Sequence, residues 1–180
     1  MTYLSLYQSP VGKLTLASDG ENLTGLWMEG QKYFGSTLEP RTEMREDLEI
    51  FQSAGQWLDA YFSGGKPEIS DLSLKPSGSG FRLEVWKILC GIPYGTVITY
   101  GEIAKDLAAR EGKNTMSAQA VGGAVGHNPI SIIIPCHRVV GADGSLTGYA
   151  GGIDKKIQLL KLEGADLSGL YIPKKNNKKK

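Results

Sequence analysis

The chain opens with three short β-prone runs of residues, at positions 3–8, 12–18 and 22–28. Two turn-forming segments separate them, Ser9-Pro10-Val11-Gly12 and Asp19-Gly20-Glu21-Asn22. Runs of this length with glycine-containing turns between them are typical of antiparallel strands joined in chain order. The pattern therefore predicts a β-meander.

Helical spacing of apolar residues replaces this pattern between Asp47 and Phe62. Ser63-Gly64-Gly65 is expected to end the helix. Further on, Leu72 and Leu74 alternate with polar neighbours, which predicts one more short strand.

The segment Pro76-Ser77-Gly78-Ser79-Gly80 is the best linker candidate in the chain. No catalytic constellation precedes it, so residues 1–76 are predicted to form an N-terminal α/β scaffold domain. Residues 80–170 are predicted to form a second domain. Its first helix presents an apolar face made by Phe81, Val85, Ile88 and Leu89.

Two N-cap signals mark the next two helices. Thr99 and Glu102 stand at the spacing of a capping box, and Ser117 precedes the following helix as a second N-cap. Two short helices joined by a connector predict a helix-turn-helix, although this arrangement is common in helical proteins.

The second of these helices, residues 118–125, consists almost wholly of small residues. Glycine inside a helix costs about 1 kcal/mol relative to alanine, so the small residues need a reason. Tight packing on a neighbouring helix is one explanation. Close approach of the helix backbone to a ligand surface, such as a nucleic-acid backbone, is the other, and the sequence does not decide between them.

The run Ile132-Ile133-Ile134-Pro135 predicts a buried strand or extended segment that enters a fixed turn. Cys136 and His137 follow directly, so a thiol and an imidazole share one small turn between apolar blocks. A Cys-His pair without further context is more often a buried structural cysteine beside a hydrogen-bonded histidine.

A Gly-rich loop, residues 146–152, and a last amphipathic helix with Ile153, Ile157 and Leu160 complete the pattern. Gly164 is expected to cap the end of that helix. Glu163 beside it, taken by itself, predicts a solvated carboxylate.

Composition narrows the class of protein. A chain of 180 residues with 41% hydrophobic and 22% charged residues fits one large or two small globular domains. It holds no apolar run long enough to span a membrane and no secretion signal. Two cysteines and two histidines argue against a zinc site and fit a reducing compartment, so a cytoplasmic location is expected.

The net charge of +1 hides an asymmetry. Residues 1–79 hold 6 basic and 11 acidic residues, whereas residues 80–180 hold 14 and 8. Five of the basic residues lie in residues 171–180, which are predicted to form a disordered basic tail. The asymmetry alone is weak support for nucleic-acid binding.

The C-terminal motifs resemble those of the O6-alkylguanine-DNA alkyltransferase family. The resemblance covers roughly residues 80–165, and its most specific part is the Pro-Cys-His-Arg-Val sequence at 135–139 with Asn128-Pro129 upstream. It implies an α/β (α+β) fold, with a ribonuclease-like N-terminal domain and a winged-helix-like C-terminal domain containing the helix-turn-helix.

The resemblance also implies the chemistry. Cys136 would be the nucleophile that takes an alkyl group from guanine, and His137 the base that activates it through a water molecule. Glu163 would orient the imidazole, and Tyr100 would donate a hydrogen bond or proton to the leaving base. Neither a metal nor a cofactor is implied, and the stable thioether product means that each molecule acts once.

The implied partner is double-stranded DNA that contains O6-alkylguanine, bound by a monomer with the target base flipped out. O4-alkylthymine is a second substrate that the sequence leaves open. The small-residue helix would enter the minor groove, which is only about 6 Å wide. Many family members carry arginine where Gln119 stands, so Gln119 is predicted to be a weaker base-flipping finger. Asn128 would tie this helix to the active-site turn, and the remaining substrate- and DNA-binding residues implied are Ala120, Gly122, Gly123, Arg138, Val139, Tyr149 and Ala150.

Two hypotheses from other classes stay open. One is a non-catalytic helix-turn-helix DNA-binding module whose cysteine is incidental. The other is a thiol hydrolase that uses Cys136, His137 and Glu163, for which the loop 148–152 is the candidate oxyanion hole. The first would bind DNA without alkyl uptake, and the second would turn over repeatedly.

Overall fold

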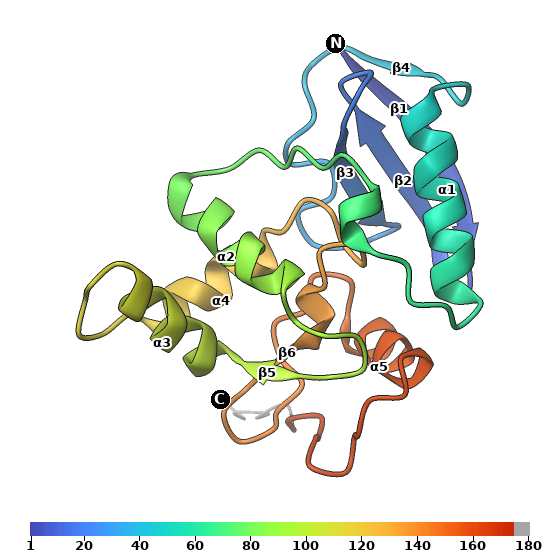
Figure 1. The fold of residues 1–180 in the computed structure, drawn as a ribbon. Helices are drawn as coiled ribbons and strands as arrows, with labels where there is room; N and C mark the ends of the chain where they lie inside the picture. The colour runs from blue at the N-terminus through green and yellow to red at the C-terminus, as the bar shows by residue number, and fades with distance from the viewer. Residues whose placement is uncertain (175–180) are drawn as a thin grey trace, which may run out of the picture.

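The structure, a computed structural model, describes residues 1–174 and begins with a four-stranded sheet (Figure 1). The strand order is β3-β2-β1-β4, antiparallel between β1, β2 and β3 and parallel between β1 and β4. Helix α1 packs along this sheet, with the 3₁₀ turn η1 after it. The bounds of these elements are β1 Thr2–Ser9, β2 Gly12–Ser18, β3 Leu23–Met28, β4 Thr42–Met44, α1 Glu49–Phe62 and η1 Ile69–Asp71.

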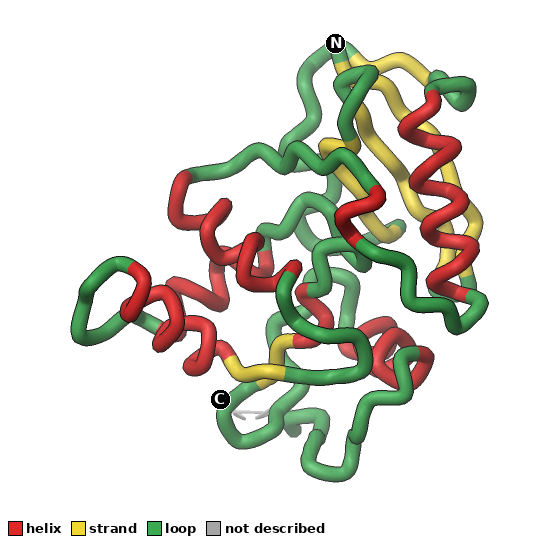
Figure 2. Tube along the Cα trace, in the orientation of Figure 1, coloured by secondary structure: helices red, strands yellow, loops and turns green. Residues whose placement is uncertain are grey.

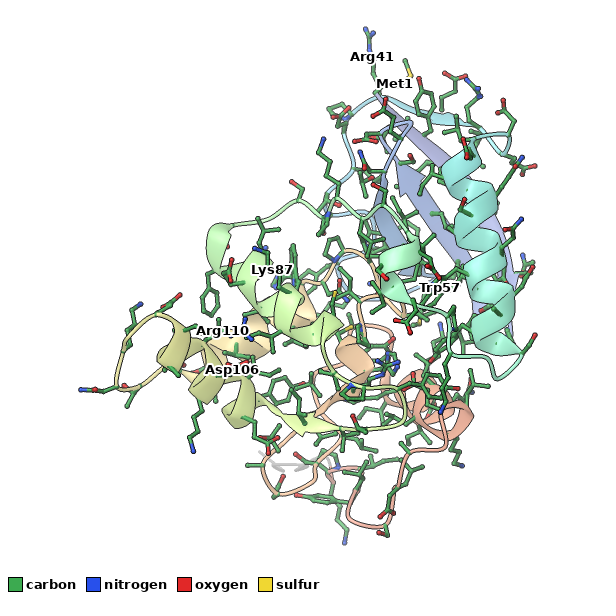
Figure 3. All side chains as sticks on the ribbon, in the orientation of Figure 1. Met1, Arg41, Trp57, Lys87, Asp106 and Arg110 are labelled. Atoms are coloured by element: carbon green, nitrogen blue, oxygen red, sulfur yellow. The ribbon has the colours of Figure 1, made fainter. Side chains whose placement is uncertain are left out.

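The predicted meander and first helix are confirmed. Ser9 and Gly12 pair at the first hairpin, where Gly12 has a φ of 105° that favours glycine. The apolar face of α1 is buried as its spacing predicts. Figure 3 labels Trp57 on this helix, where its indole Nε1 donates to the carbonyl oxygen of Glu68 at 2.9 Å.

Helices dominate the second half of the chain (Figure 2). The two predicted N-caps are confirmed: the Thr99–Glu102 capping box is complete, and the Ser117 hydroxyl accepts from the Ala120 amide. The Asp106–Arg110 ion pair lies on the surface of α3 (Figure 3). The bounds are α2 Gly80–Cys90, β5 Ile98–Thr99, α3 Tyr100–Arg110, α4 Ala118–Gly126, η2 Cys136–Arg138, β6 Val139–Val140 and α5 Ile153–Leu162.

Two predicted strands are wrong. Leu74 makes a single bridge to Leu23 after η1, with no strand around it. Residues 132–134 form a turn, because Ile132 has a φ of 71° and the Ile134 amide donates to the Ile130 carbonyl oxygen. Positive φ is rare for a β-branched residue and is incompatible with a strand.

Part of the predicted basic tail is described. Tyr171 forms a bridge with Ser145, and its carbonyl oxygen accepts from the Leu146 amide at 2.8 Å. Residues 175–180, which carry four of the five lysines, lie outside the described residues. Within residues 1–174, no helix has the length and apolar character that crossing a membrane requires.

The two halves meet at the free edge of β3. The Leu26 amide donates to the Pro129 carbonyl oxygen at 2.8 Å, and the Ser131 amide donates to the Leu26 carbonyl oxygen at 2.9 Å. One continuous apolar cluster contains residues from β2, β3 and α1 together with residues from α2, α3, α4 and the Cys136 turn. The N-terminal sheet therefore positions the segment that leads to Cys136.

Candidate active site

Cys136 opens η2 and is buried, with 5% of its surface exposed. The turn before it is stiff, because Ile132 is held at positive φ in the core and Pro135 fixes its own φ. Backbone strain of this kind persists only where the surroundings impose it, and it concentrates at functional sites.

Asn128 joins the end of α4 to this turn. Its Nδ2 donates to the carbonyl oxygens of Ile134 at 2.8 Å and Ile130 at 3.3 Å, and its Oδ1 accepts from the Ile130 amide at 3.0 Å. The Asn128 side chain also lowers the pKa of the Cys136 thiol, against the larger effect of burial. Asn128 therefore connects the end of α4 to the backbone that leads into Cys136.

A buried network surrounds the carboxylate of Glu163. His137 Nε2 lies 2.5 Å from Oε2, and the Arg138 guanidinium donates to both carboxylate oxygens, with Nε 2.7 Å from Oε1. Tyr61 of α1 donates to Oε2 at 2.6 Å, and the Gly95 amide donates to Oε1 at 3.1 Å. The expected solvated carboxylate is thus wrong, because the Glu163 side chain is 0% exposed.

The end of α5 places Glu163 in this network. Gly164 has a φ of 70°, its amide donates to the Lys161 carbonyl oxygen, and the Ala165 amide donates to that of Leu160. These bonds form a Schellman motif, which confirms the predicted glycine cap and points the preceding side chain inward.

The charge states follow from these contacts. Burial alone raises the pKa of Glu163, but the hydrogen bonds from His137, Arg138 and Tyr61 outweigh it and hold the pKa far below its usual range. Burial lowers the pKa of His137, against the opposing effect of Glu163, so the imidazole is neutral. An ionised carboxylate accepts the Nε2 proton, which leaves the lone pair on Nδ1.

His137 Nδ1 is buried and has no hydrogen-bond partner among residues 1–174. Burial raises the pKa of the adjacent Cys136 thiol, so the thiol is protonated at neutral pH and needs a base. The turn thus carries a protonated thiol and, on the next residue, a neutral imidazole with a free lone pair, the two groups that a nucleophile and its base require.

Lys156 is a site residue that the sequence analysis missed. It is fully buried on α5, and its Nζ donates to the carbonyl oxygens of Val139 and, at 3.2 Å, Thr147. Burial lowers the pKa of Lys156 to about 8, and the positive charge in turn lowers the pKa of Cys136. Lys156 therefore favours the thiolate and fixes two carbonyls of the site.

The predicted substrate-binding residues are distributed around this centre. Tyr100 donates from its hydroxyl to Thr147 at 2.9 Å, and burial followed by the charge of Cys136 raises the pKa of Tyr100 to about 12. Val139 is buried with its carbonyl on Lys156, whereas Tyr149 and Ala150 line a cavity of about 390 Å³.

Arg138 is buried instead of exposed on the surface. Only 6% of the residue is exposed, and besides Glu163 its guanidinium donates to the Ile92 carbonyl oxygen at 2.7 Å. Arg138 is therefore a partner of the Glu163 carboxylate, and its assignment to the substrate- and DNA-binding residues stays a prediction.

One face of α4 is open. Gln119, Ala120 and Gly123 are exposed, and a Cβ added at Gly123 would meet nothing within 4 Å. Gly122 instead faces the Tyr100 ring, where an added Cβ would lie 3.7 Å from Cδ1. Tight packing on a neighbouring helix therefore does not explain the glycine at position 123. This favours the other explanation, close approach of a ligand surface to the helix backbone.

Two family models cover most of the chain. One, described as 6-O-methylguanine DNA methyltransferase, DNA binding domain, matches residues 80–165, and the other, the ribonuclease-like domain of the same enzyme, matches residues 2–76. A methylated-DNA–protein-cysteine methyltransferase of Mycobacterium tuberculosis is 47% identical over 163 residues, 91% of this chain and 93% of that protein. The chain belongs to this family.

Another curated relative and a solved structure of the family are also similar to this chain. The Haemophilus influenzae methylated-DNA–protein-cysteine methyltransferase is 42% identical over 161 residues, 89% of this chain and 86% of that protein. Among solved structures, Mycobacterium tuberculosis OGT in complex with DNA has a TM-score of 0.78 at 45% identity, covering 90% of this chain and 92% of that one. The predicted mixed α/β fold class is confirmed.

Proposed function

We propose that this chain repairs DNA by moving an alkyl group from the O6 atom of guanine to the Sγ atom of Cys136. The observation that carries the proposal is the buried His137, whose Nε2 is held by Glu163 while Nδ1 has no partner among residues 1–174. The family's methylated-DNA–protein-cysteine methyltransferases, close to this chain in sequence, supply the reaction class.

The transfer begins with the thiol. His137 Nδ1 takes the Cys136 proton through a water molecule, and Glu163 stabilises the resulting imidazolium. The thiolate attacks the alkyl carbon in line with the C–O6 bond, so that the S–C bond forms as the C–O6 bond breaks. The electron pair of the broken bond stays on the guanine.

The leaving guanine then needs a proton. Tyr100 is protonated at neutral pH and can donate its hydroxyl proton if it releases the Thr147 carbonyl oxygen. The proton that His137 took from the thiol then replaces the one that Tyr100 gave up. The products are a neutral guanine and a neutral thioether. Because no step regenerates the thiol, the protein reacts once.

A time course with excess O6-methylguanine duplex tests this account against the two other classes. One methyl group transferred per protein molecule, with no further release, is the expected result. Continued turnover would favour a thiol hydrolase, and DNA binding without transfer would favour a binding module.

DNA binding is assigned to the open face of α4, with Gln119 as the base-flipping finger. We further propose that the protein acts as a monomer on O6-alkylguanine in duplex DNA. The expectation of a cytoplasmic location rests on the sparse cysteine content alone.

Replacing Gln119 with arginine is expected to strengthen duplex binding. The number of counterions released on binding, read from the salt dependence of the affinity, is expected to rise by about one. Fluorescence anisotropy at several salt concentrations measures this, and single-turnover rates measure repair. Gln52→Arg adds the same charge to the exposed surface of α1 and serves as the control. Unchanged affinity and rate in Gln119→Arg would refute the finger role.

A further inference from the structure

A segment of the N-terminal half reaches across to the cavity that Tyr149 and Ala150 line. This segment, residues 28–34 and here called the strap, begins at the last residue of β3 (Figure 1). The cavity is lined by Lys32 and Tyr33 of the strap, by Gly122, Gly123, Gly126 and His127 around α4, and by Gly148, Tyr149 and Ala150. The N-terminal half thus contributes to the site instead of serving as scaffold alone.

Hydrogen bonds hold the strap to both sides of the site. Gln31 is buried, and its Oε1 accepts from the Met28 amide at 2.7 Å and from the Ser131 hydroxyl at 3.2 Å. The Lys32 amide donates to the Ala150 carbonyl oxygen at 3.0 Å. The strap is therefore tied to the Cys136 turn at one point and to the Gly-rich loop at another.

Two stacked aromatic rings line the cavity, one from the strap and one from the end of α4. They are called the aromatic pair. The Tyr33 ring stacks on the His127 ring with 3.9 Å between centroids and 23° between planes. His127 Nδ1 lies 2.7 Å from the Gly123 carbonyl oxygen, which orients the imidazole. Tyr33 has a φ of 61°, a conformation that is uncommon outside glycine and that the strap's anchors maintain.

The remaining walls are largely backbone. Gly122, Gly123 and Gly126 leave the α4 side bare, and Gly148 has no space for a side chain because an added Cβ would lie 2.9 Å from the Tyr100 hydroxyl. Tyr33, in contrast, lines the cavity with a large side chain, and this residue is 38% exposed. Removing either ring of the aromatic pair would therefore enlarge the cavity.

We propose that the Tyr33–His127 stack limits the size of the O6-alkyl group that the site accepts. The proposal rests on the function proposed above and adds its substrate class: small O6-alkyl groups in preference to bulky ones. A flipped guanine that enters between α4 and the Gly-rich loop brings its alkyl group to the cavity beside Tyr149, whose ring centroid lies 6.5 Å from that of His137, the residue after Cys136. A larger group must extend towards the aromatic pair.

The test compares single-turnover rates on two duplexes of the same sequence, one with O6-methylguanine and one with O6-benzylguanine. The shared duplex cancels effects on DNA binding in the ratio of the two rates. Tyr33→Ala is expected to raise the benzyl-to-methyl ratio by about tenfold or more, the scale on which pocket shape discriminates substrates. His127→Ala removes the other ring and is expected to raise the same ratio.

Two variants serve as controls. Tyr33→Phe keeps the ring and is expected to keep the wild-type ratio, and Phe34→Ala removes an exposed neighbour that packs on Trp27 instead. An unchanged ratio in both Tyr33→Ala and His127→Ala, or an equal fall in both rates, overturns the proposal. Failure of the wild-type protein to accept methyl overturns the proposed function itself, so the two failures are distinguishable.

Discussion

Replacing Glu163 with glutamine is expected to slow alkyl transfer by about a hundredfold or more, the range of general acid–base catalysis. The amide cannot stabilise the imidazolium that forms when His137 accepts the thiol proton. It also leaves the Arg138 guanidinium buried without a counter-charge, and breaking a buried pair costs about 3–5 kcal/mol of folding free energy. Single-turnover rates and urea denaturation measure the two effects.

Tyr61→Phe is the matched comparison for Glu163→Gln. It removes one hydrogen bond to the same carboxylate and leaves the charge, so it is expected to cost about 1 kcal/mol of stability and to slow transfer far less. A Glu163→Gln protein that transfers alkyl groups at the wild-type rate would show that His137 needs no charged partner.

Replacing Lys156 with methionine is expected to slow transfer at neutral pH by about tenfold for each unit by which the thiol pKa rises. The positive charge of Lys156 lowers the pKa of Cys136. Without this charge, burial raises the pKa of the thiol further. In the wild-type protein, Lys156 is charged and stabilises the thiolate below a pH of about 8, which is its pKa. Above that pH Lys156 is neutral and the stabilisation is lost. The variant's rate should therefore approach the wild-type rate as the pH rises.

A pH–rate profile separates this electrostatic effect from simple loss of structure. A rate that is reduced equally at every pH would mean that Lys156 acts only by holding the carbonyl oxygens of Val139 and Thr147. Lys155→Met makes the same change one residue earlier on α5, where Nζ contacts the Glu29 carbonyl oxygen at 3.3 Å, and should leave the profile unchanged.

Local signals in the sequence predicted the features that depend on neighbouring residues. The Thr99–Glu102 capping box, the Ser117 cap and the Gly164 helix end each satisfy backbone groups within a few positions, so spacing alone identifies them. Three isoleucines in a row favour a strand at Ile132, whereas the surrounding core imposes a positive φ there and so a turn.

Features that depend on distant residues escaped prediction. Glu163 is buried because Arg138 and Tyr61 meet it, and Tyr61 lies 102 residues away in the sequence. The strap carries no comparable local signal, and its place beside the Cys136 turn depends on the Gln31–Ser131 hydrogen bond. Lys156 did carry a signal, because it stands at helical spacing from Leu159 and Leu160 and so on the buried face of α5.

The central claim, that Cys136 is the acceptor of the alkyl group, is tested most directly by intact-protein mass spectrometry after incubation with an O6-methylguanine duplex. The account predicts that every wild-type molecule gains the mass of one CH₂ group, that peptide mapping places it on Cys136, and that Cys136→Ala gains nothing. A wild-type mass that stays unchanged while the protein still binds the duplex, or a gain that persists in Cys136→Ala, would contradict it.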